Sequence, residues 1–399
     1  MNQTTPSVLQ VARERRQPLG FSVGAYLRGM DWILLAATLA LVTYGFFMLY
    51  SATHLSFPDN PFYYVRSQAI GLIIGLVFLI SLSVANYKWF ARWQMYIYGG
   101  GIILLILTLV VGTGGEDVGA NRWLEYGSFR LQTAELVKFM LILAFGAVLT
   151  EGVELRGRFR FIVMCVIYML IPGILIYLQP DLGTALVLAA VLVVMLVVWG
   201  IRLPHLGMVA GAALAAAVLA LRVLPTVFGT SLLKDYQIRR LTLFLDPEKE
   251  PLHGGYQLIQ SKIAVGSGMF SGKGYLQGAQ HNLHFVPERH TDFIFAVIGE
   301  ELGFLGGALL IGLFAIVVWR AFRIARMSRD IYGTLIAAGV AAVLVFQVFL
   351  NIGMTIGIMP VTGLPLPFIS FGSSSLVVFL MAVGLLESIH VHSVAGEAK

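Results

Sequence analysis

Long blocks of apolar residues alternate with short polar segments along almost the whole chain. Most blocks approach the roughly 20 apolar residues that an α-helix needs to cross a bilayer. A helix on the surface of a soluble protein keeps a polar face, which these blocks lack. The pattern therefore predicts an all-α polytopic membrane protein with about ten transmembrane helices. The blocks are Ile33–Leu49, Ala69–Val84, Ile97–Val111, Leu136–Leu149, Phe161–Leu178, Leu182–Trp199, Leu206–Phe228, Phe293–Trp319, Ile331–Ile358 and Leu376–Ile389.

The composition supports this interpretation. Of the 399 residues, 58% are hydrophobic and only 12% are charged, whereas soluble proteins carry roughly 25% charged residues. Residues 1–28 are polar and lead directly into a full-length apolar block, which is typical of a signal anchor rather than a cleaved signal peptide. The single cysteine, Cys165, lies within a block, so we expect neither a disulfide nor a redox motif.

The distribution of Lys and Arg predicts the orientation. With the N-terminus inside, the short outer loops carry only Arg66, Arg122 and Arg130. This bias predicts that both termini are cytoplasmic. The net charge of +6 mostly reflects the same bias, and no basic stripe indicates nucleic-acid binding. The inner loops carry Lys88, Arg92, Arg156, Arg158, Arg160, Arg202, Arg320, Arg323, Arg326 and Arg329.

One large polar loop, residues 229–291, is predicted on the outer face. It belongs to a single membrane domain at 29–393, between cytoplasmic tails at 1–28 and 394–399. The loop is rich in basic residues, which either bind an anionic ligand or contact anionic lipid head groups. Those residues are Lys234, Arg239, Arg240, Lys249, Lys262, Lys273 and Arg289.

Within this loop, Tyr236–Leu245 has an apolar face and suits a short helix lying flat in the membrane interface. It ends at Asp246, where the following Pro247 disfavours helical geometry. The glycine-rich stretch 266–274 lacks the spacing of a nucleotide-binding phosphate loop. We interpret it as turns, with Lys273 as an anion contact.

Ionisable residues inside the blocks are costly, at least ~2.5–3.5 kcal/mol at the membrane centre, and so mark candidate functional sites. Glu135 and Lys138 are three residues apart and share a helical face, either as a structural ion pair or as substrate contacts. Asp181 either caps a helix or faces the outer half of the membrane. Glu300 and Glu301 either line a cavity or mark a segment that is not a simple span.

Several other polar groups are candidates for substrate contacts or simple caps. Arg122 lies in an outer loop, where it is able to meet phosphate. The residues His290 to Asp292 open an apolar block, where they either only cap a helix or, like Asp181, face the outer half of the membrane. The segment Pro360–Ser375 starts the last helix, whose free amides either hold an anion or, more simply, are N-capped. His281, His284 and His290 lack accompanying ligands, so we predict no metal site formed by protein side chains.

The motifs along the chain resemble those of the SEDS family of bacterial cell-wall proteins (shape, elongation, division and sporulation). The resemblance runs from about Asp31 to the last apolar block. The pieces that carry it are Asn121–Trp123, Gln179–Thr184, Phe244–Pro247, Gly255–Ser261, Gly272–Gly274, Pro287–Ala296 and Asn351–Ser375.

The segments Pro287–Asp292, Asn351–Met354 and Pro360–Pro367 are more similar to the elongation branch of the family, with the division branch as the close alternative. Two segments depart from the family pattern. Ser370–Ser375 reads Ser-Phe-Gly-Ser-Ser-Ser in place of Ser-Tyr-Gly-Gly-Ser-Ser, and Gln132–Glu135 reads Gln-Thr-Ala-Glu in place of Gln-Pro-Ser-Glu. The acid is kept in the second motif, so the departure concerns the local backbone more than the chemistry.

The resemblance implies a peptidoglycan glycosyltransferase that joins lipid II, a lipid-linked disaccharide-peptide, at the outer surface of the bacterial cytoplasmic membrane. It implies a class B penicillin-binding protein as partner. It also places the family's essential aspartate on Asp246. The family's membrane-embedded polar residues fall on Arg122, Glu135, Lys138 and Asp181.

The residue types present agree with this chemistry. Glycosyl transfer from a pyrophosphate-linked sugar needs a carboxylate as general base, for which Asp246 is the candidate. It also needs fixed positive charge at the developing pyrophosphate, for which Arg239, Arg240, Lys138 and Arg122 are candidates. No cofactor is evident, although a divalent cation (Mg²⁺ or Mn²⁺) would be able to assist. A transporter of the lipid-linked precursor is the alternative, and a passive scaffold would leave the costly buried carboxylates unexplained.

Overall fold

The computed structural model describes residues 23–56, 59–114, 121–126, 129–219, 240, 243–244, 246, 254–279, 285 and 288–394. Within these residues, nine helices are long and apolar enough to cross a membrane, which confirms an all-helical polytopic membrane protein. They are α3 (Trp32–Thr53), α4 (Tyr63–Val84), α6 (Gln94–Val111), α7 (Thr133–Glu151), α8 (Phe159–Leu178), α9 (Leu182–Trp199), α15 (Ile294–Met327), α16 (Ile331–Ile356) and α17 (Ser373–Val394).

The span expected at Leu206–Phe228 corresponds to helix α10 (Leu203–Val218), which begins three residues earlier. Residues 220–228 lie outside the described part of the chain, so the full length of this span stays a prediction. The interfacial helix expected at Tyr236–Leu245 also lies largely outside it. The shorter described elements are α2 (Val23–Arg28), α5 (Lys88–Arg92), β1 (Trp123–Tyr126), β2 (Phe129–Gln132), the 3₁₀ turn η1 (Val153–Leu155) and α13 (Gly254–Ser267).

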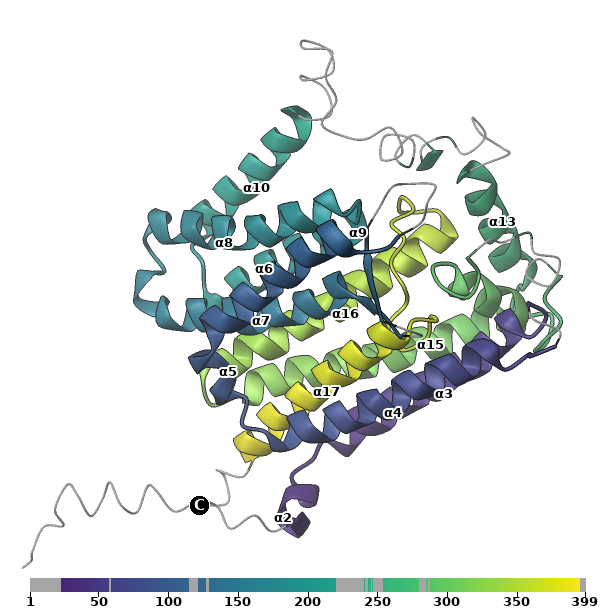
Figure 1. The fold of residues 1–399 in the computed structure, drawn as a ribbon, viewed down its shortest axis with the longest axis horizontal. Helices are drawn as coiled ribbons and strands as arrows, with labels where there is room; N and C mark the ends of the chain where they lie inside the picture. Colours follow the sequence, from purple (N-terminus) through teal and green to yellow (C-terminus); the bar gives the residue numbers. More distant parts are fainter. Residues whose placement is uncertain are drawn as a thin grey trace, which may run out of the picture.

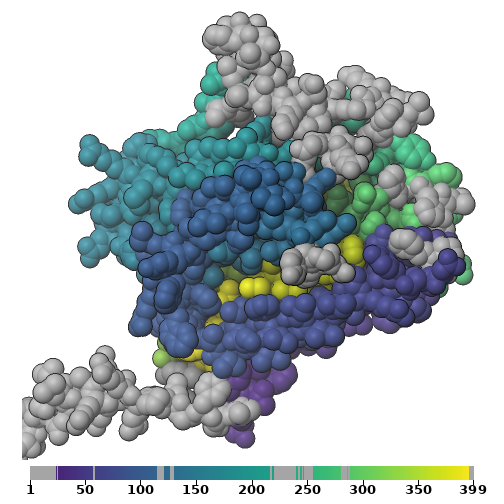
Figure 2. All heavy atoms as spheres, in the orientation of Figure 1, coloured from purple at the N-terminus to yellow at the C-terminus, as the bar shows by residue number. Residues whose placement is uncertain are grey.

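Helix α17 forms the interior of the bundle (Figure 1) and shows on one face only as a narrow strip beside α4 (Figure 2). About 94% of its most apolar stretch is buried, against 17% for the peripheral α6. Glycines allow α4 to lie directly on α17, since a Cβ on Gly71 would come within 2.8 Å of Ser373. Peripheral helices such as α6 turn their apolar side chains outward, as expected for helices in contact with lipid.

Helix α15 is broken near its N-terminal end at Gly303, where φ is 61° and ψ is −154°. Inside a membrane protein, the backbone groups freed by such a break need partners. The glycine-rich segment 268–274 supplies them through four main-chain hydrogen bonds, so the predicted turns interlock with the helix. The bonds join Lys273 N to Glu300 O (3.0 Å), Gly274 N to Glu301 O (3.0 Å), Phe304 N to Met269 O (2.9 Å) and Leu305 N to Phe270 O (3.1 Å).

The two carboxylates at this break, Glu300 and Glu301, are fully buried. Glu300 pairs with Lys273, with 2.7 Å between Oε1 and Nζ. The Ser51 hydroxyl donates to the Glu301 carboxylate at 2.7 Å, which links this helix to α3. Of the two interpretations of Glu300 and Glu301, the structure therefore supports a segment that is not a simple span.

We expect Gly272→Ala to destabilise the protein, because Gly272 has a φ of +78° and a Cβ there would overlap the carbonyl oxygen of Glu301. Left-handed strain alone costs ~1–3 kcal/mol. Thermal unfolding in detergent should show a fall in Tm of several degrees. Gly266→Ala is the matched control, because a Cβ at Gly266 meets open space. Equal Tm values for the two variants would contradict the interlock.

Candidate active site

Asp292 lies in the turn that precedes α15, where three parts of the chain meet. Its Oδ2 atom lies close to Gly363, since a Cβ built on Gly363 would be 3.4 Å away. The same Cβ would be 3.8 Å from Nη1 of Arg240, which donates to the carbonyl of Thr362 at 3.4 Å. Gly363 has a φ of +72°, a conformation that glycine adopts readily. The backbone here thus admits a carboxylate and a guanidinium side by side.

Charged groups surround this carboxylate. The pKa of Asp292 is raised to about 6: burial and the charges of Glu288 and Asp181 raise it, whereas Arg240 and Arg122 lower it. All four residues therefore lie within electrostatic range of Asp292. A carboxylate with a pKa near the operating pH is suited to general-base work.

Asp181 and Arg122 shape the neighbouring turn. Asp181 caps α9, accepting from the amide and hydroxyl of Thr184 at 2.9 and 2.8 Å, so the capping interpretation is confirmed. Arg122 donates through Nε to the carbonyl of Gln179 at 3.1 Å and through Nη2 to that of Pro180. The Arg122 guanidinium thus holds the turn before α9 through two of its nitrogens.

Glu135 and Lys138 form the ion pair that their spacing predicts. Their Oε1 and Nζ atoms are 2.7 Å apart, and both side chains are fully buried. Lys138 also donates to Oε1 of Gln347 at 2.8 Å, and the Ser375 hydroxyl lies 3.5 Å from the other carboxylate oxygen. Each charge therefore has a partner, as a buried pair requires.

The family can be assigned from the whole chain. The profile of the FtsW, RodA and SpoVE family, described as "Cell cycle protein", matches residues 31–395. The chain belongs to this family.

Known SEDS proteins match over nearly their full length. The chain is 38% identical to the probable peptidoglycan glycosyltransferase FtsW of Trichlorobacter lovleyi, over 90% of this chain and 92% of that protein. It is 36% identical to the peptidoglycan glycosyltransferase MrdB (RodA) of Escherichia coli, over 91% and 94%. A solved structure described as "Structural coordination of polymerization and crosslinking by a peptidoglycan synthase complex" matches with a TM-score of 0.76 at 33% identity, over 91% and 98%.

Among the site residues predicted from the sequence, Arg122, Asp181 and Arg240 lie in the cluster around Asp292. Lys273 is paired with Glu300 at the break in α15, which gives it a structural partner in place of a free charge. Arg239 lies outside the described residues. Asp246 is described and partly buried, and its catalytic role stays a prediction.

Asp292 was not among the site residues predicted from the sequence, because its place before an apolar block also suits a helix cap. The N-cap of α15 is Phe293, and no side chain caps that helix. The capping interpretation of Asp292 is therefore wrong. A signal was present, since Asp292 lies inside one of the SEDS motifs, Pro287–Ala296. Arg240 and Asp181 are distant in sequence, and only the fold brings their charges within electrostatic range of Asp292.

We expect Glu135→Gln and Lys138→Met, made singly, each to lower the folded yield, because each leaves one buried charge without its partner. Breaking a buried pair costs ~3–5 kcal/mol. Size-exclusion chromatography after heating in detergent would measure this loss. The double variant should recover much of the yield, since it buries no charge. Single variants as stable as the wild type would show that the pair contributes nothing.

Proposed function

We propose that this SEDS protein is a peptidoglycan glycosyltransferase that polymerises lipid II into glycan strands during cell elongation. The observation that carries the proposal is a carboxylate, Asp292, that lies beside the Arg240 guanidinium at Gly363, in a family whose named relatives are peptidoglycan glycosyltransferases. The elongation role rests on the sequence motifs, because FtsW and MrdB relatives are about equally identical to the chain.

The proposed reaction joins a sugar hydroxyl to the anomeric carbon of a second lipid-linked unit. A new C–O bond forms, the bond to the pyrophosphate breaks, and the hydroxyl proton passes to a carboxylate. Arg240 and Arg122 supply positive charge for the leaving pyrophosphate. We propose that Mg²⁺ or Mn²⁺ assists there. The described residues contain no cluster of three or more His, Cys, Asp or Glu, so substrate oxygens would provide much of its coordination.

Two carboxylates compete for the role of general base. The sequence resemblance assigns it to Asp246, at the end of the expected interfacial helix. The structure favours Asp292, because its carboxylate and the Arg240 guanidinium both lie at Gly363 and its pKa is raised to about 6. A base must be deprotonated to act, so with Asp292 as the base the rate should rise as the pH increases through about 6.

Asp292→Asn and Asp246→Asn separate these assignments. The residue that acts as base should lose about 10²–10⁴-fold in polymerisation when changed, because asparagine cannot accept the proton. The other variant should retain most of its rate. Purified protein with its partner would be incubated with lipid II, and glycan length read on gels. Near-normal polymerisation by both variants would exclude both candidates.

The same assay distinguishes an enzyme from a transporter of the lipid-linked precursor. A transporter would yield no polymer from the wild-type protein with purified lipid II. It would instead move lipid II across the bilayer of proteoliposomes. Buried charges also occur away from the cluster around Asp292, where Asp31 pairs with Arg320 beside Glu387, so their distribution does not decide between the two functions. The named relatives, which are peptidoglycan glycosyltransferases, support the enzyme.

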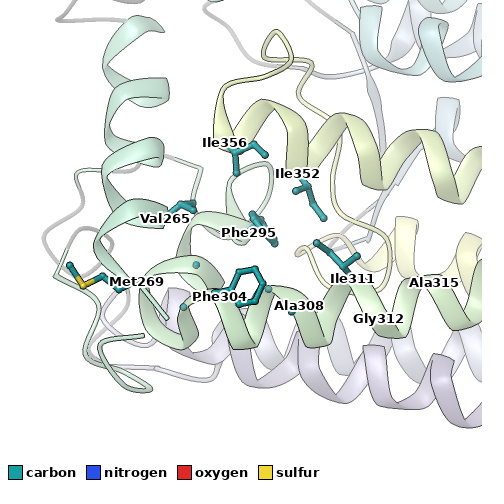
Figure 3. A pocket seen from close by; sticks show the side chains of 13 residues that line it. Val265, Met269, Phe295, Phe304, Ala308, Ile311, Gly312, Ala315, Ile352 and Ile356 are labelled. Atoms are coloured by element: carbon teal, nitrogen blue, oxygen red, sulfur yellow. The ribbon is translucent and has the colours of Figure 1, made fainter. Parts of the chain in front are cut away.

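We propose a class B penicillin-binding protein as partner, supported by the structural relative whose description couples polymerisation to crosslinking. An apolar pocket of about 610 Å³ lies between α13, α15 and α16 (Figure 3). Gly299, Gly303 and Gly307 line it at intervals of four residues. The pocket has an apolar lining, so it is a candidate surface for a membrane helix of that partner.

We propose that both termini face the cytoplasm and that the Asp292 cluster faces outward. Exposed positions on either side test this orientation in a Cys165→Ala background. Asp59→Cys, between α3 and α4, should react with a membrane-impermeant thiol reagent in intact cells. Arg158→Cys, between α7 and α8, should react only after permeabilisation. The reverse pattern would place the site in the wrong compartment.

A further inference from the structure

The non-helical segment 360–371, which joins α16 to α17, depends on side chains from outside it to satisfy its carbonyl groups. Two fully buried amides of α16, Gln347 and Asn351, are four residues apart and therefore share one face of the helix. Gln347 donates to the carbonyl of Pro365 at 2.9 Å. Asn351 donates to that of Leu364 at 2.7 Å. The face of α16 that carries these amides thus holds the middle of the segment.

Asn351 also makes a second bond that Gln347 does not share. Its Nδ2 donates at 2.9 Å to the main-chain carbonyl of Asp292. One amide group thereby joins the segment before α15 to the segment before α17. The Oδ1 atom of Asn351 is buried and has no hydrogen-bond partner among the described residues. The side chain thus uses its donor group for two hydrogen bonds to main-chain carbonyls at the site.

We propose that Asn351 is a positioning residue for glycosyl transfer. By holding the carbonyl of Asp292 to that of Leu364, it fixes the Asp292 carboxylate relative to the Arg240 guanidinium. This inference rests on the proposed function with Asp292 as the base. Asn351 bonds main-chain carbonyls and not the Asp292 carboxylate, so it acts through the main chain.

Neighbouring bonds show why Asn351 is the decisive contact. Ser370 donates through Oγ to the carbonyl of Thr291 at 2.6 Å, and the amide of Phe371 donates to that of His290 at 2.8 Å. These bonds hold the residues before Asp292. Among the described contacts, the bond from Asn351 is the one that holds the carbonyl of Asp292 itself.

A general base must lie within hydrogen-bond reach of the proton that it accepts. A misplacement of about 1 Å is able to cost on the order of 10²-fold in rate. Loss of the Asn351 bond should therefore lower kcat more than it changes KM for lipid II. Loss of this bond should also change the position of the Asp292 carboxylate relative to its charged neighbours. These neighbours are Glu288, Asp181, Arg240 and Arg122.

The test compares Asn351→Leu and Asn351→Ser with Thr355→Val. Leucine removes the donor at similar size, and serine keeps a shorter donor. Thr355 is a matched control, because it is equally buried on α16 and its hydroxyl bonds within that helix, to the carbonyl of Asn351. Folded protein would be isolated by size exclusion, and lipid II polymerisation measured as kcat and KM from pH 5 to pH 8.

We expect kcat of Asn351→Leu to fall about 10–100-fold, with KM changed less than about two-fold. The rise of rate with pH should move to lower pH, because a carboxylate that is less firmly enclosed is better hydrated. The kcat of Asn351→Ser should lie between those of Asn351→Leu and the wild type. The kcat of Thr355→Val should equal that of the wild type.

Three results would overturn the proposal. The first is wild-type kcat and an unchanged pH profile in folded Asn351→Leu. The second is an equal loss of kcat in Thr355→Val. The third is failure of both Asn351 variants to fold. The proposed function fails separately, if the wild-type protein forms no polymer or if Asp292→Asn keeps its rate.

Discussion

Carbonyl groups of non-helical backbone within a membrane protein need hydrogen-bond donors. In this chain, the side chains that supply these donors also bring the parts of the site together. The segment 360–371 has no helix of its own in which to satisfy its carbonyl groups. Gln347 and Asn351 of α16 do so in its middle, and Ser370 ties its end to Thr291. Asp292, Thr362 and Gly363 come together because these donors bring their backbones together.

The buried ion pair of α7, Glu135 with Lys138, is connected to the same hydrogen-bond network. Lys138 is held by Glu135 and by the side-chain oxygen of Gln347, whose amide nitrogen bonds the carbonyl of Pro365. Charge on α7 is thereby connected to the segment beside Asp292 through one glutamine. In a low-dielectric interior such a network is stable only when each member is satisfied. The pair therefore has a structural use that is independent of any contact with substrate.

The length and composition of the apolar blocks were sufficient to predict the helical fold, because about 20 consecutive apolar residues identify a membrane helix. The pairing of Glu135 with Lys138 followed from their spacing, and the cap at Asp181 from its place before an apolar block. Asp292 was misjudged because its partners, Arg240 and Gly363, are distant in sequence. The break at Gly303 was equally hidden, since Glu300 and Glu301 signalled something unusual without showing that segment 268–274 inserts there. Roles that depend on non-local contacts cannot be read from local patterns.

The interlock at the break in α15 has a mechanical consequence. Four main-chain hydrogen bonds join the end of α13 to both sides of Gly303. A displacement of the segment after α13 would therefore act on α15 at the residues on either side of Gly303, which has no side chain to resist bending. The rest of α15, from Phe304 to Met327, keeps helical geometry, so any bending of α15 would be concentrated at Gly303, eleven residues along the chain from Asp292.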